Sequence, residues 1–148
     1  MTENNSNLAI SLFSEILTVD QLFRDRMAKI LPKGMELSHF AVLHQLANIN
    51  VERTPAQLAK SFHVTRGAMT NTLAKLELAG YIHIRPDWED ARRKLVALSH
   101  AGHEARNNAL ASVSPVISAL IEDLSAQKVK SILPALRDLR QKLEAQSD

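Results

Sequence analysis

The sequence predicts a mainly α-helical fold with one small β-hairpin. Apolar residues recur every three or four positions over two long stretches at the ends of the chain, as in amphipathic helices. Between them lie two shorter stretches that each begin with a helix N-cap signal. After these come two short alternating stretches separated by a proline and a cluster of charges, which is the pattern of two strands joined by a turn.

The composition is that of one ordinary globular domain. The chain of 148 residues is 45% hydrophobic and 23% charged, which argues against a disordered chain. It has no cysteine, which excludes disulfides, thiolate metal sites and cysteine redox chemistry. The polar first residues lack the basic start of a signal peptide, and no apolar run approaches the roughly 18 residues of a membrane span. We therefore expect a cytoplasmic protein with no membrane partner.

Basic residues concentrate in the middle of the chain. Residues 53–100 hold eight of the 18 basic and four of the 16 acidic side chains. The middle is therefore net positive, whereas the remainder is slightly negative. A basic centre of this kind is typical of a face that binds a polyanion. The alternative is a chance fluctuation of charge.

Residues 8–31 are expected to form the first helix. Their apolar positions follow at steps of three or four residues, and Pro32 with Gly34 stops the pattern. Ser38 can N-cap a second helix, whose apolar residues begin at Phe40.

Two short helices are expected in the middle of the chain. Thr54, with Pro55 at the first helical position and Gln57 three residues after the cap, forms a capping box. Thr65 caps the next helix, and Gly80 stands where a left-handed residue closes it. The buried stripe of this helix is expected to be Met69, Thr72, Leu73 and Leu76.

The two strands are expected at residues 81–84 and 95–98. The stretch "RPDWEDARRKL", residues 85–95, joins them as a hairpin loop with its shoulders, and Pro86 fits a loop because it would break a central strand. Ser99 then caps a long final helical region. Pro115 and Pro134 lie inside that region and should kink or interrupt it.

Two short helices followed by a hairpin indicate a winged helix-turn-helix, in which the second helix enters the major groove of DNA. In that role Arg66 can bind guanine, Asn71 suits adenine, Gly67 admits a close backbone approach, and the threonine hydroxyls with Lys75 can hold phosphates. The alternative is an ordinary solvated helix face. The exposed face of this helix is expected to be Thr65, Arg66, Gly67, Thr70, Asn71, Ala74 and Lys75.

The hairpin loop carries a second set of candidate DNA contacts. Arg92 can enter the minor groove, and Asp90, two residues earlier, can pair with its guanidinium and hold it in place. Arg93 and Lys94 can contact phosphates. The acidic Asp87 and Glu89 are expected only to balance charge on an exposed loop.

Trp88 is the one tryptophan of the chain. It can pack on the base of the hairpin or stack on Pro86. A direct contact with DNA is the less favoured alternative.

Three stretches carry a family resemblance: "DARRKLVALS" at residues 90–99, "RGAMTNTLAKLELAGYI" at 66–82 and "TPAQLAKSF" at 54–62. They resemble the wing, the recognition helix with the following strand, and the preceding helix of the MarR family of bacterial winged-helix repressors. Ser99 replaces the threonine of the family's wing pattern. The resemblance covers nearly the whole chain and implies that Arg92 is the minor-groove arginine and Asp90 its partner.

The apolar stripes of the terminal segments exceed what a domain of this size can bury against itself, which favours a homodimer. We expect a single domain over residues 1–148, with dimerisation helices at 8–31 and 100–145 around a winged unit at 38–98. A homodimer would bind a pseudo-palindromic operator on double-stranded DNA. The resemblance also implies a pocket for a small anionic aromatic effector, with candidate lining residues Phe13, Leu17, Arg24, His39, Phe40 and Leu43.

Other classes of function have less support. A winged helix can serve as a protein-interaction module, which would bind DNA weakly without sequence preference and would lose its partner when Trp88 is changed. No paired carboxylates, Gly-rich phosphate loop or Ser/Cys–His arrangement suggests an enzyme. The histidine spacings do not favour a zinc site, so no metal or cofactor is expected.

Overall fold

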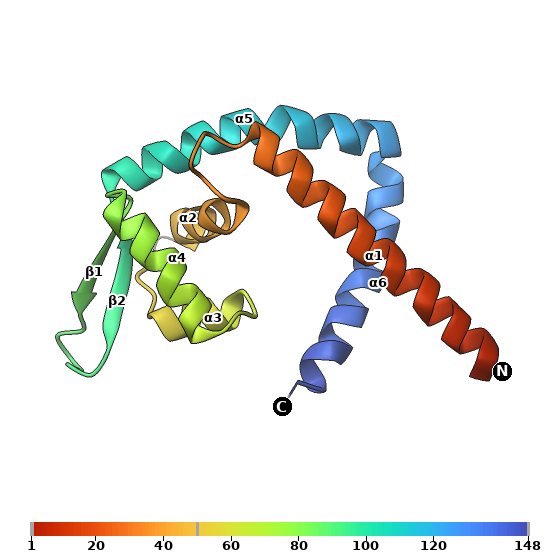
Figure 1. The fold of residues 1–148 in the computed structure, drawn as a ribbon, viewed down its shortest axis with the longest axis horizontal. Helices are drawn as coiled ribbons and strands as arrows, with labels where there is room; N and C mark the ends of the chain where they lie inside the picture. The colour runs from red at the N-terminus through yellow and green to blue at the C-terminus, as the bar shows by residue number, and fades with distance from the viewer. Residues whose placement is uncertain (1, 50, 148) are drawn as a thin grey trace. The chain divides into compact units, whose positions relative to one another are not determined.

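The computed structural model describes residues 2–49 and 51–147, and the chain divides into two compact units, Met1–Ser112 and Val113–Asp148. It is mainly helical with one two-stranded antiparallel hairpin, as the sequence predicts. The elements in chain order are α1 (Thr2–Ile30), α2 (Leu37–Ile49), α3 (Pro55–Ser61), α4 (Arg66–Leu78), β1 (Ile82–Pro86), β2 (Lys94–Leu98), α5 (His100–Leu124) and α6 (Ala126–Ala145) (Figure 1).

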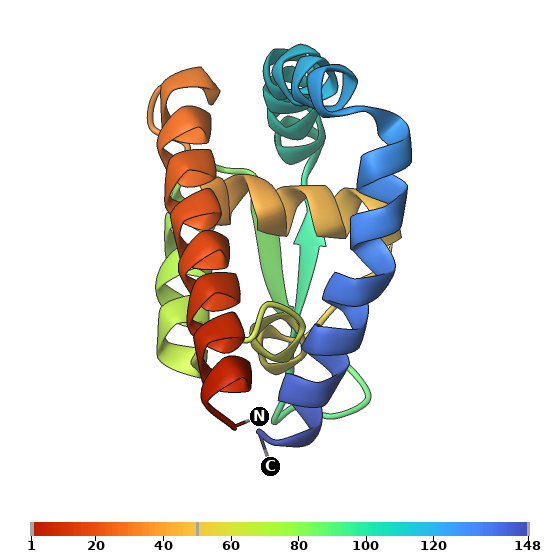
Figure 2. The ribbon, with the colours of Figure 1, turned by 90° about the vertical axis from the view of Figure 1, so that its right-hand side faces the viewer.

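The core of the first unit joins α2, α3, α4 and the hairpin. In Figure 2, α2 crosses the two strands, and α3 lies beside it, seen nearly end-on. Met69, Leu73 and Leu76 of α4 are buried as the helical spacing predicts, whereas Thr72 is only partly covered. The core cluster consists of Val42, Leu43, Leu46, Leu58, Ala59, Met69, Leu73, Leu76, Ile82 and Val96.

The expected cap of the second helix is wrong. The helix begins at Leu37, so Ser38 lies inside its first turn. The backbone N–H of Glu36 donates to Nδ1 of His39 at 3.2 Å, and the N–H of Phe40 donates to the carbonyl oxygen of Glu36 at 3.1 Å. The ring nitrogen of His39 therefore accepts from the backbone of the residue before the helix, as the third residue of a capping box does.

The expected caps of α3 and α4 are confirmed. The hydroxyl of Thr54 accepts from the N–H of Gln57 at 3.1 Å, and the Gln57 side chain accepts from the N–H of Thr54 at 2.9 Å. The hydroxyl of Thr65 accepts from the N–H of Ala68 at 3.1 Å. These three bonds satisfy backbone donors at the helix starts, so the two helices of the motif begin where the sequence places them.

The hairpin follows α4 directly. Gly80 has a φ of +81°, the left-handed conformation expected of it. The strands pair from Ile82↔Leu98 to Pro86↔Lys94, so β1 begins one residue later than expected and includes Pro86. The proline is tolerated because it ends an edge strand, where its missing N–H costs no central ladder bond.

Two close contacts fix the start of α5 against the end of α4. The hydroxyl of Ser99 accepts from the N–H of Gly102 at 3.0 Å, which confirms Ser99 as the cap, and donates to the carbonyl oxygen of Gly80 at 2.6 Å. A Cβ on Gly102 would overlap the carbonyl oxygen of Tyr81. Only glycine therefore fits at this position.

The last helical region is interrupted, but not at either of its two prolines as expected. Pro115 is inside α5 and Pro134 is inside α6, and neither ends its helix. The break is at Ser125, which has a φ of 89° and caps α6 by accepting from the N–H of Lys128 at 3.2 Å. Each proline removes one backbone donor, whereas a left-handed residue redirects the chain.

No single helix within residues 2–49 and 51–147 is long and apolar enough to cross a membrane. One bent pair, α5 with α6, meets the test by length and composition, with 96° between its two helices.

Candidate nucleic-acid interface

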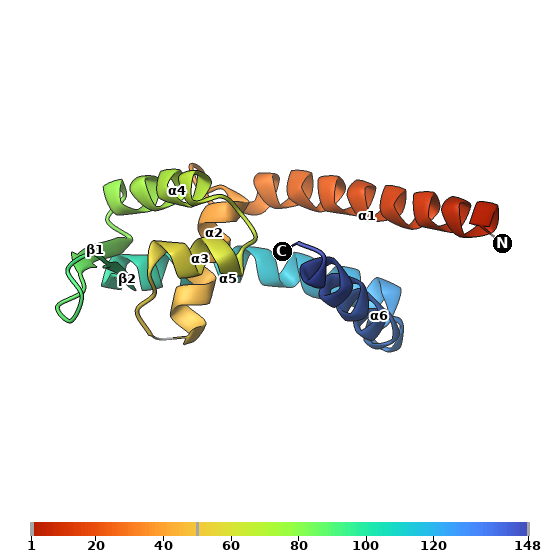
Figure 3. The same ribbon diagram turned by 90° about the horizontal axis from the view of Figure 1, so that it is seen from below.

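A basic groove lies between α3, α4 and the hairpin. From the end of α4 the hairpin runs back past this helix and α3 (Figures 1 and 3). The groove has a volume of about 450 Å3, and the four positive side chains that line it face no acidic lining residue among the described ones. Its lining residues are Thr54, Pro55, Ala56, Arg66, Thr70, Arg92, Arg93 and Lys94.

The first turns of α4 present an exposed surface beside this groove. Arg66, Gly67 and Asn71 are exposed, and Met69 is the buried residue among them. A Cβ on Gly67 would meet nothing closer than 4.0 Å, so packing does not require a glycine there. The hydroxyl of Thr70 donates to the carbonyl oxygen of Arg66 at 2.8 Å. Thr70 therefore has its proton engaged and offers only acceptor capacity to a partner.

The pairing expected between Asp90 and Arg92 is confirmed. Nε of Arg92 lies 3.1 Å from Oδ1 of Asp90, and Nη2 lies 3.4 Å from Oδ2. The backbone N–H of Arg92 also donates to Oδ1 at 3.1 Å. These bonds hold the pKa of Asp90 below its usual value, with the side-chain bond from Arg92 as the largest cause. Asp90 therefore fixes the orientation of the Arg92 guanidinium. The Arg92 side chain is 91% exposed and remains accessible to a partner.

Asp87 balances charge as expected, since its Oδ2 lies 3.9 Å from Nε of Arg93, but it also has a structural role. Its side chain is 15% exposed, and its Oδ1 accepts from the N–H of Glu89 at 2.9 Å. Its backbone N–H donates to the carbonyl oxygen of Arg93 at 2.9 Å, and its own carbonyl accepts from Asp90. Asp87 therefore organises the hairpin loop, as aspartate often does in turns. Glu89 is exposed, as expected of a charge-balancing residue.

Trp88 packs on the side chain of Arg85 rather than on Pro86. The guanidinium carbon of Arg85 lies 3.9 Å from the centroid of the tryptophan ring. The same guanidinium forms an ion pair with Glu52, in which Nε lies 2.9 Å from Oε2. Sequence reasoning missed Glu52, because 33 residues separate it from Arg85 and no local pattern links them.

The comparisons with known proteins agree with this geometry. A model described as MarR family matches residues 33–93. The HTH-type transcriptional repressor YetL of Bacillus subtilis (strain 168) is 27% identical over 117 residues, 78% of this chain and 70% of the relative. A cysteine-to-serine variant of MarR from E. coli, solved with operator DNA, has a TM-score of 0.81 at 26% identity, covering 90% of this chain and 96% of that one. The chain is thus similar to MarR-family regulators in the sequence of its winged unit and in its fold.

The same architecture recurs in a more distant structure. The transcriptional regulator BldR from Sulfolobus solfataricus matches with a TM-score of 0.80 at 21% identity, over 90% of this chain and 94% of that one. The described chain therefore has the winged-helix architecture of DNA-binding transcriptional regulators, a class of protein that is not a class of enzymes.

The structure does not bring Lys75 to the groove. It lies about 13 Å further along α4 than Arg66, at 1.5 Å per residue, and its Nζ is 4.0 Å from Oε1 of Glu36. One group of predicted contacts therefore lines the groove: Arg66, Thr70 and the basic residues of the hairpin loop. Lys75 lies outside this group.

The six candidate effector residues do not line one cavity of the described chain. Arg24 lines a cavity of about 420 Å3, and His39 lines a different one. Phe13 and Leu17 are exposed on α1. Leu43 is fully buried in the core, and Phe40 stacks on the ring of His44 with centroids 5.5 Å apart.

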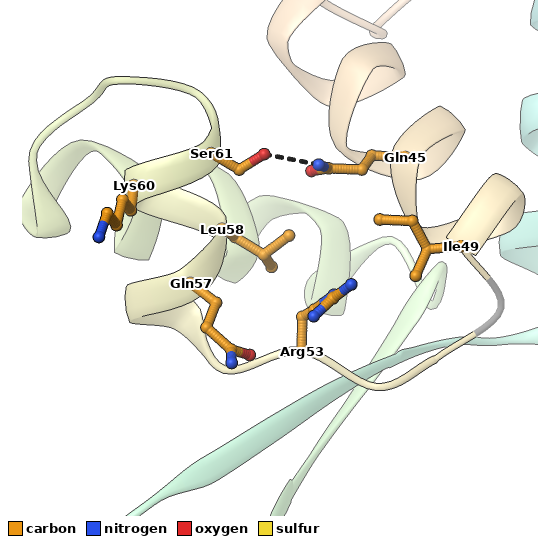
Figure 4. Close-up of a pocket in the computed structure, with 7 residues that line it drawn as sticks. All are labelled: Gln45, Ile49, Arg53, Gln57, Leu58, Lys60 and Ser61. Carbon is orange, nitrogen blue, oxygen red and sulfur yellow. Dashed lines mark hydrogen bonds between the residues drawn. The ribbon is translucent and has the colours of Figure 1, made fainter. Parts of the chain in front are cut away.

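Another cavity, of about 310 Å3, lies between α2 and α3 (Figure 4). Figure 4 shows the side chain of Arg53 in it, near Ile49 and Leu58, while Gln45 donates to the hydroxyl of Ser61 at 2.6 Å. Arg53 also forms a backbone bridge with Val96 of β2. Its backbone therefore extends the hairpin, while its side chain belongs to this separate cavity.

Proposed function

We propose that this chain is a repressor that reads a pseudo-palindromic operator on double-stranded DNA as a homodimer, in the cytoplasm. The start of α4 enters the major groove and the hairpin loop lies along the adjacent minor groove. The proposed contacts are Thr65, Arg66, Gly67, Thr70, Asn71, Arg92, Arg93 and Lys94, with Asp90 as the partner of Arg92 and Lys75 as an outlying phosphate contact.

One observation carries this proposal. The basic groove gathers Arg66 from α4 and Arg92, Arg93 and Lys94 from the hairpin on one surface, although these residues lie far apart in sequence. Neighbouring cations repel one another unless a polyanion neutralises them. The described contacts satisfy Arg92 through Asp90 alone and leave its side chain 91% exposed, which suits a residue that inserts into a narrow, negative groove.

Exposed apolar side chains support the homodimer. Leu8, Leu17 and Leu22 of α1 are 63%, 68% and 63% exposed. On α6 the exposed large apolar residues are Ile132, Leu133, Leu136 and Leu143. Apolar surface of this extent is typical of a protein interface. Under two-fold symmetry the partner would cover it and present a second reading helix.

The cavity that contains Arg24 supports a small anionic aromatic effector. Its lining is mostly apolar, and within the described part of the chain Arg24 pairs with Asp20 at 2.9 Å. A carboxylate or phenolate could take the place of Asp20 while an aromatic ring fills the apolar part. Ala68, Met69 and Thr72 of α4 also line this cavity, so an occupant would contact the reading helix and could shift its population of DNA-binding conformations.

Affinity for the DNA beside the chain's own gene tests the proposal. A labelled intergenic fragment containing a palindrome should bind with strong salt dependence, since phosphate contacts release counterions. Arg66→Ala and Arg92→Ala should each weaken binding, whereas Arg137→Ala, an exposed arginine of α6, should not. If both groove variants bind every DNA fragment as well as the wild type does, the proposal is wrong.

A further inference from the structure

We infer that Glu52, Arg85 and Trp88 form a clamp that positions the hairpin loop, and so aims Arg92, without any of the three reading DNA. We call these three residues the wing clamp. The inference rests on the proposed function and deepens it, because it assigns a role in DNA recognition to residues outside the basic groove.

The ion pair is the first part of the wing clamp. Arg85 lies near the end of β1, and Glu52 lies in the segment between α2 and α3. Both carboxylate oxygens of Glu52 accept from Arg85, Oε2 from Nε at 2.9 Å and Oε1 from Nη2. Both side chains are about one third exposed. A two-point pair of this geometry fixes direction as well as distance.

The tryptophan is the second part. Trp88 lies over the guanidinium of Arg85 at 3.9 Å and is itself 82% exposed. Nη1 of Arg85 donates to the carbonyl oxygen of Pro86 at 2.9 Å. Arg85 is therefore engaged along its donor edges and on a ring face, so it is poorly placed to bind a phosphate. Arg85 therefore binds other groups of the protein and stabilises the loop, and the cation–π contact adds a modest attraction.

A continuous set of contacts leads from the wing clamp to Arg92. Beside Trp88, Asp87 accepts from the N–H of Glu89, and the carbonyl of Asp87 accepts from the N–H of Asp90. Asp90 then holds Arg92. At the other end, Glu52 stands next to Arg53, whose backbone bonds to Val96 of β2. The loop is thus tied to the body of the winged unit through a side-chain contact near its tip and a backbone bridge near its base.

The negative charge of Glu52 makes the two explanations predict opposite changes in DNA affinity. An acidic residue near a surface that binds DNA opposes binding, so its neutralisation should strengthen binding if electrostatics alone matter. If Glu52 acts through Arg85 and Trp88, its neutralisation should weaken binding instead. Glu89 is the matched control, because it is an exposed acidic residue of the hairpin loop. Its backbone N–H bonds to Asp87, but its carboxylate takes no part in the wing clamp.

The test compares the full chain with Glu52→Gln, Trp88→Leu, Trp88→Phe and Glu89→Gln in a DNA-binding titration at several salt concentrations. Glu52→Gln and Trp88→Leu should each weaken binding about two- to fivefold, the range for an exposed ion pair or cation–π contact. Trp88→Phe keeps an aromatic face and should retain most of the affinity. Glu52→Gln with Trp88→Leu should be no weaker than either single variant, since both release the same clamp.

Two further readouts separate positioning from direct contact. The salt dependence of binding should stay unchanged in Glu52→Gln, because no phosphate contact is removed, whereas Arg92→Ala should lower its slope by about one. The fluorescence of Trp88, the one tryptophan of the chain, should become easier to quench with acrylamide in Glu52→Gln.

The outcomes distinguish this inference from the proposed function. If the wild type binds no DNA specifically, the proposed function fails. If the wild type binds and Arg92→Ala loses affinity, but Glu52→Gln binds as tightly as Glu89→Gln, the wing clamp is overturned while the function stands. The wing clamp would also be overturned if Trp88→Leu lost affinity while Glu52→Gln did not, because the tryptophan would then contact DNA itself. Trp88 is so exposed that its variants should fold.

Discussion

Asp90 and Arg92 hold each other through three hydrogen bonds on the hairpin loop, with the arginine almost fully exposed. Two of the bonds orient the guanidinium, and the third fixes the backbone of the loop. The pair thus places one positive charge in a set direction before any partner arrives. Because less ordering remains to be done on binding, such preorganisation favours affinity.

Asp90→Asn tests the value of this orientation. The variant loses the charge-assisted part of the pair, and we expect DNA affinity to fall by about fivefold, the order of one exposed ion pair. This fall should occur although a negative charge near the DNA has been removed. A DNA titration checks it, with Glu89→Gln as the control for the change of charge. Equal affinities of the two variants would contradict the expected role of Asp90.

The local signals of the sequence located most of the fold. Thr54 and Thr65 cap their helices as expected, because a cap depends on residues three positions away. The pair of Asp90 and Arg92 could be predicted for the same reason, because the two residues are only two positions apart in the sequence. The start of α2 escaped prediction because a histidine nitrogen, which is not among the usual cap residues, accepts the bond from Glu36.

Features that depend on distant residues could not be predicted. No pattern in the sequence joins Glu52 to Arg85, and the position of Trp88 follows from that pair. The break at Ser125 was also hidden, because serine rarely adopts a left-handed conformation while prolines stand nearby as stronger signals. The candidate effector residues follow from resemblance and apolar character alone, and the fold places them in the core, in two cavities and on the exposed side of α1.

Gly67→Ala should separate stability from DNA binding. The new methyl group meets open space, so thermal unfolding should show a gain of about 0.5–1 kcal/mol from reduced backbone freedom. DNA affinity should fall, because the methyl group would stand where the proposed interface brings the backbone close to DNA. A variant with higher stability and unchanged affinity would remove Gly67 from the interface.

Gly102→Ala is the contrasting substitution. Its methyl group would overlap the carbonyl oxygen of Tyr81 and press on Leu98. The free energy of unfolding should therefore drop by about 3 kcal/mol, at the upper end of the usual cost of overpacking. Denaturant unfolding measures this, and Gly67→Ala serves as the control for the same chemical change in open space.

The capping box of α3 should contribute measurable stability. Thr54→Ala removes the acceptor for the N–H of Gln57, and we expect a loss of about 1 kcal/mol in the free energy of unfolding. Thr18→Ala is a suitable control, since the exposed hydroxyl of Thr18 donates to the carbonyl oxygen of Ser14 within α1 and caps no helix start there. Equal stabilities of the two variants would argue against the cap.

His39 should make stability depend on pH. Burial lowers the pKa of His39 below 6.5, the carboxylate of Glu36 partly offsets this, and the positive charge of Lys75 adds to it. The unfolded chain therefore binds the proton more readily. The contribution of His39 is complete above pH 6.5 and decreases as the pH falls through the lowered pKa. Protonation also removes the Nδ1 acceptor that bonds to the N–H of Glu36.

Denaturant unfolding at several pH values measures this effect. The wild type should lose stability as the pH falls below 6.5, the unperturbed pKa of histidine. His39→Gln should flatten that part of the curve, whereas His83→Gln, a change at an exposed position of β1, should not. A curve of the wild-type form in His39→Gln would exclude His39 as the source.

The central claim is that the start of α4 and the hairpin loop form one DNA-binding surface. The most direct test is the salt dependence of affinity for a palindromic operator in the wild type, Arg66→Ala, Arg92→Ala and the control Arg137→Ala. Both groove variants should bind at least about fivefold more weakly, consistent with about 1–3 kcal/mol per specific arginine contact, and the control should match the wild type. Wild-type affinity and salt slope in both groove variants would contradict the claim.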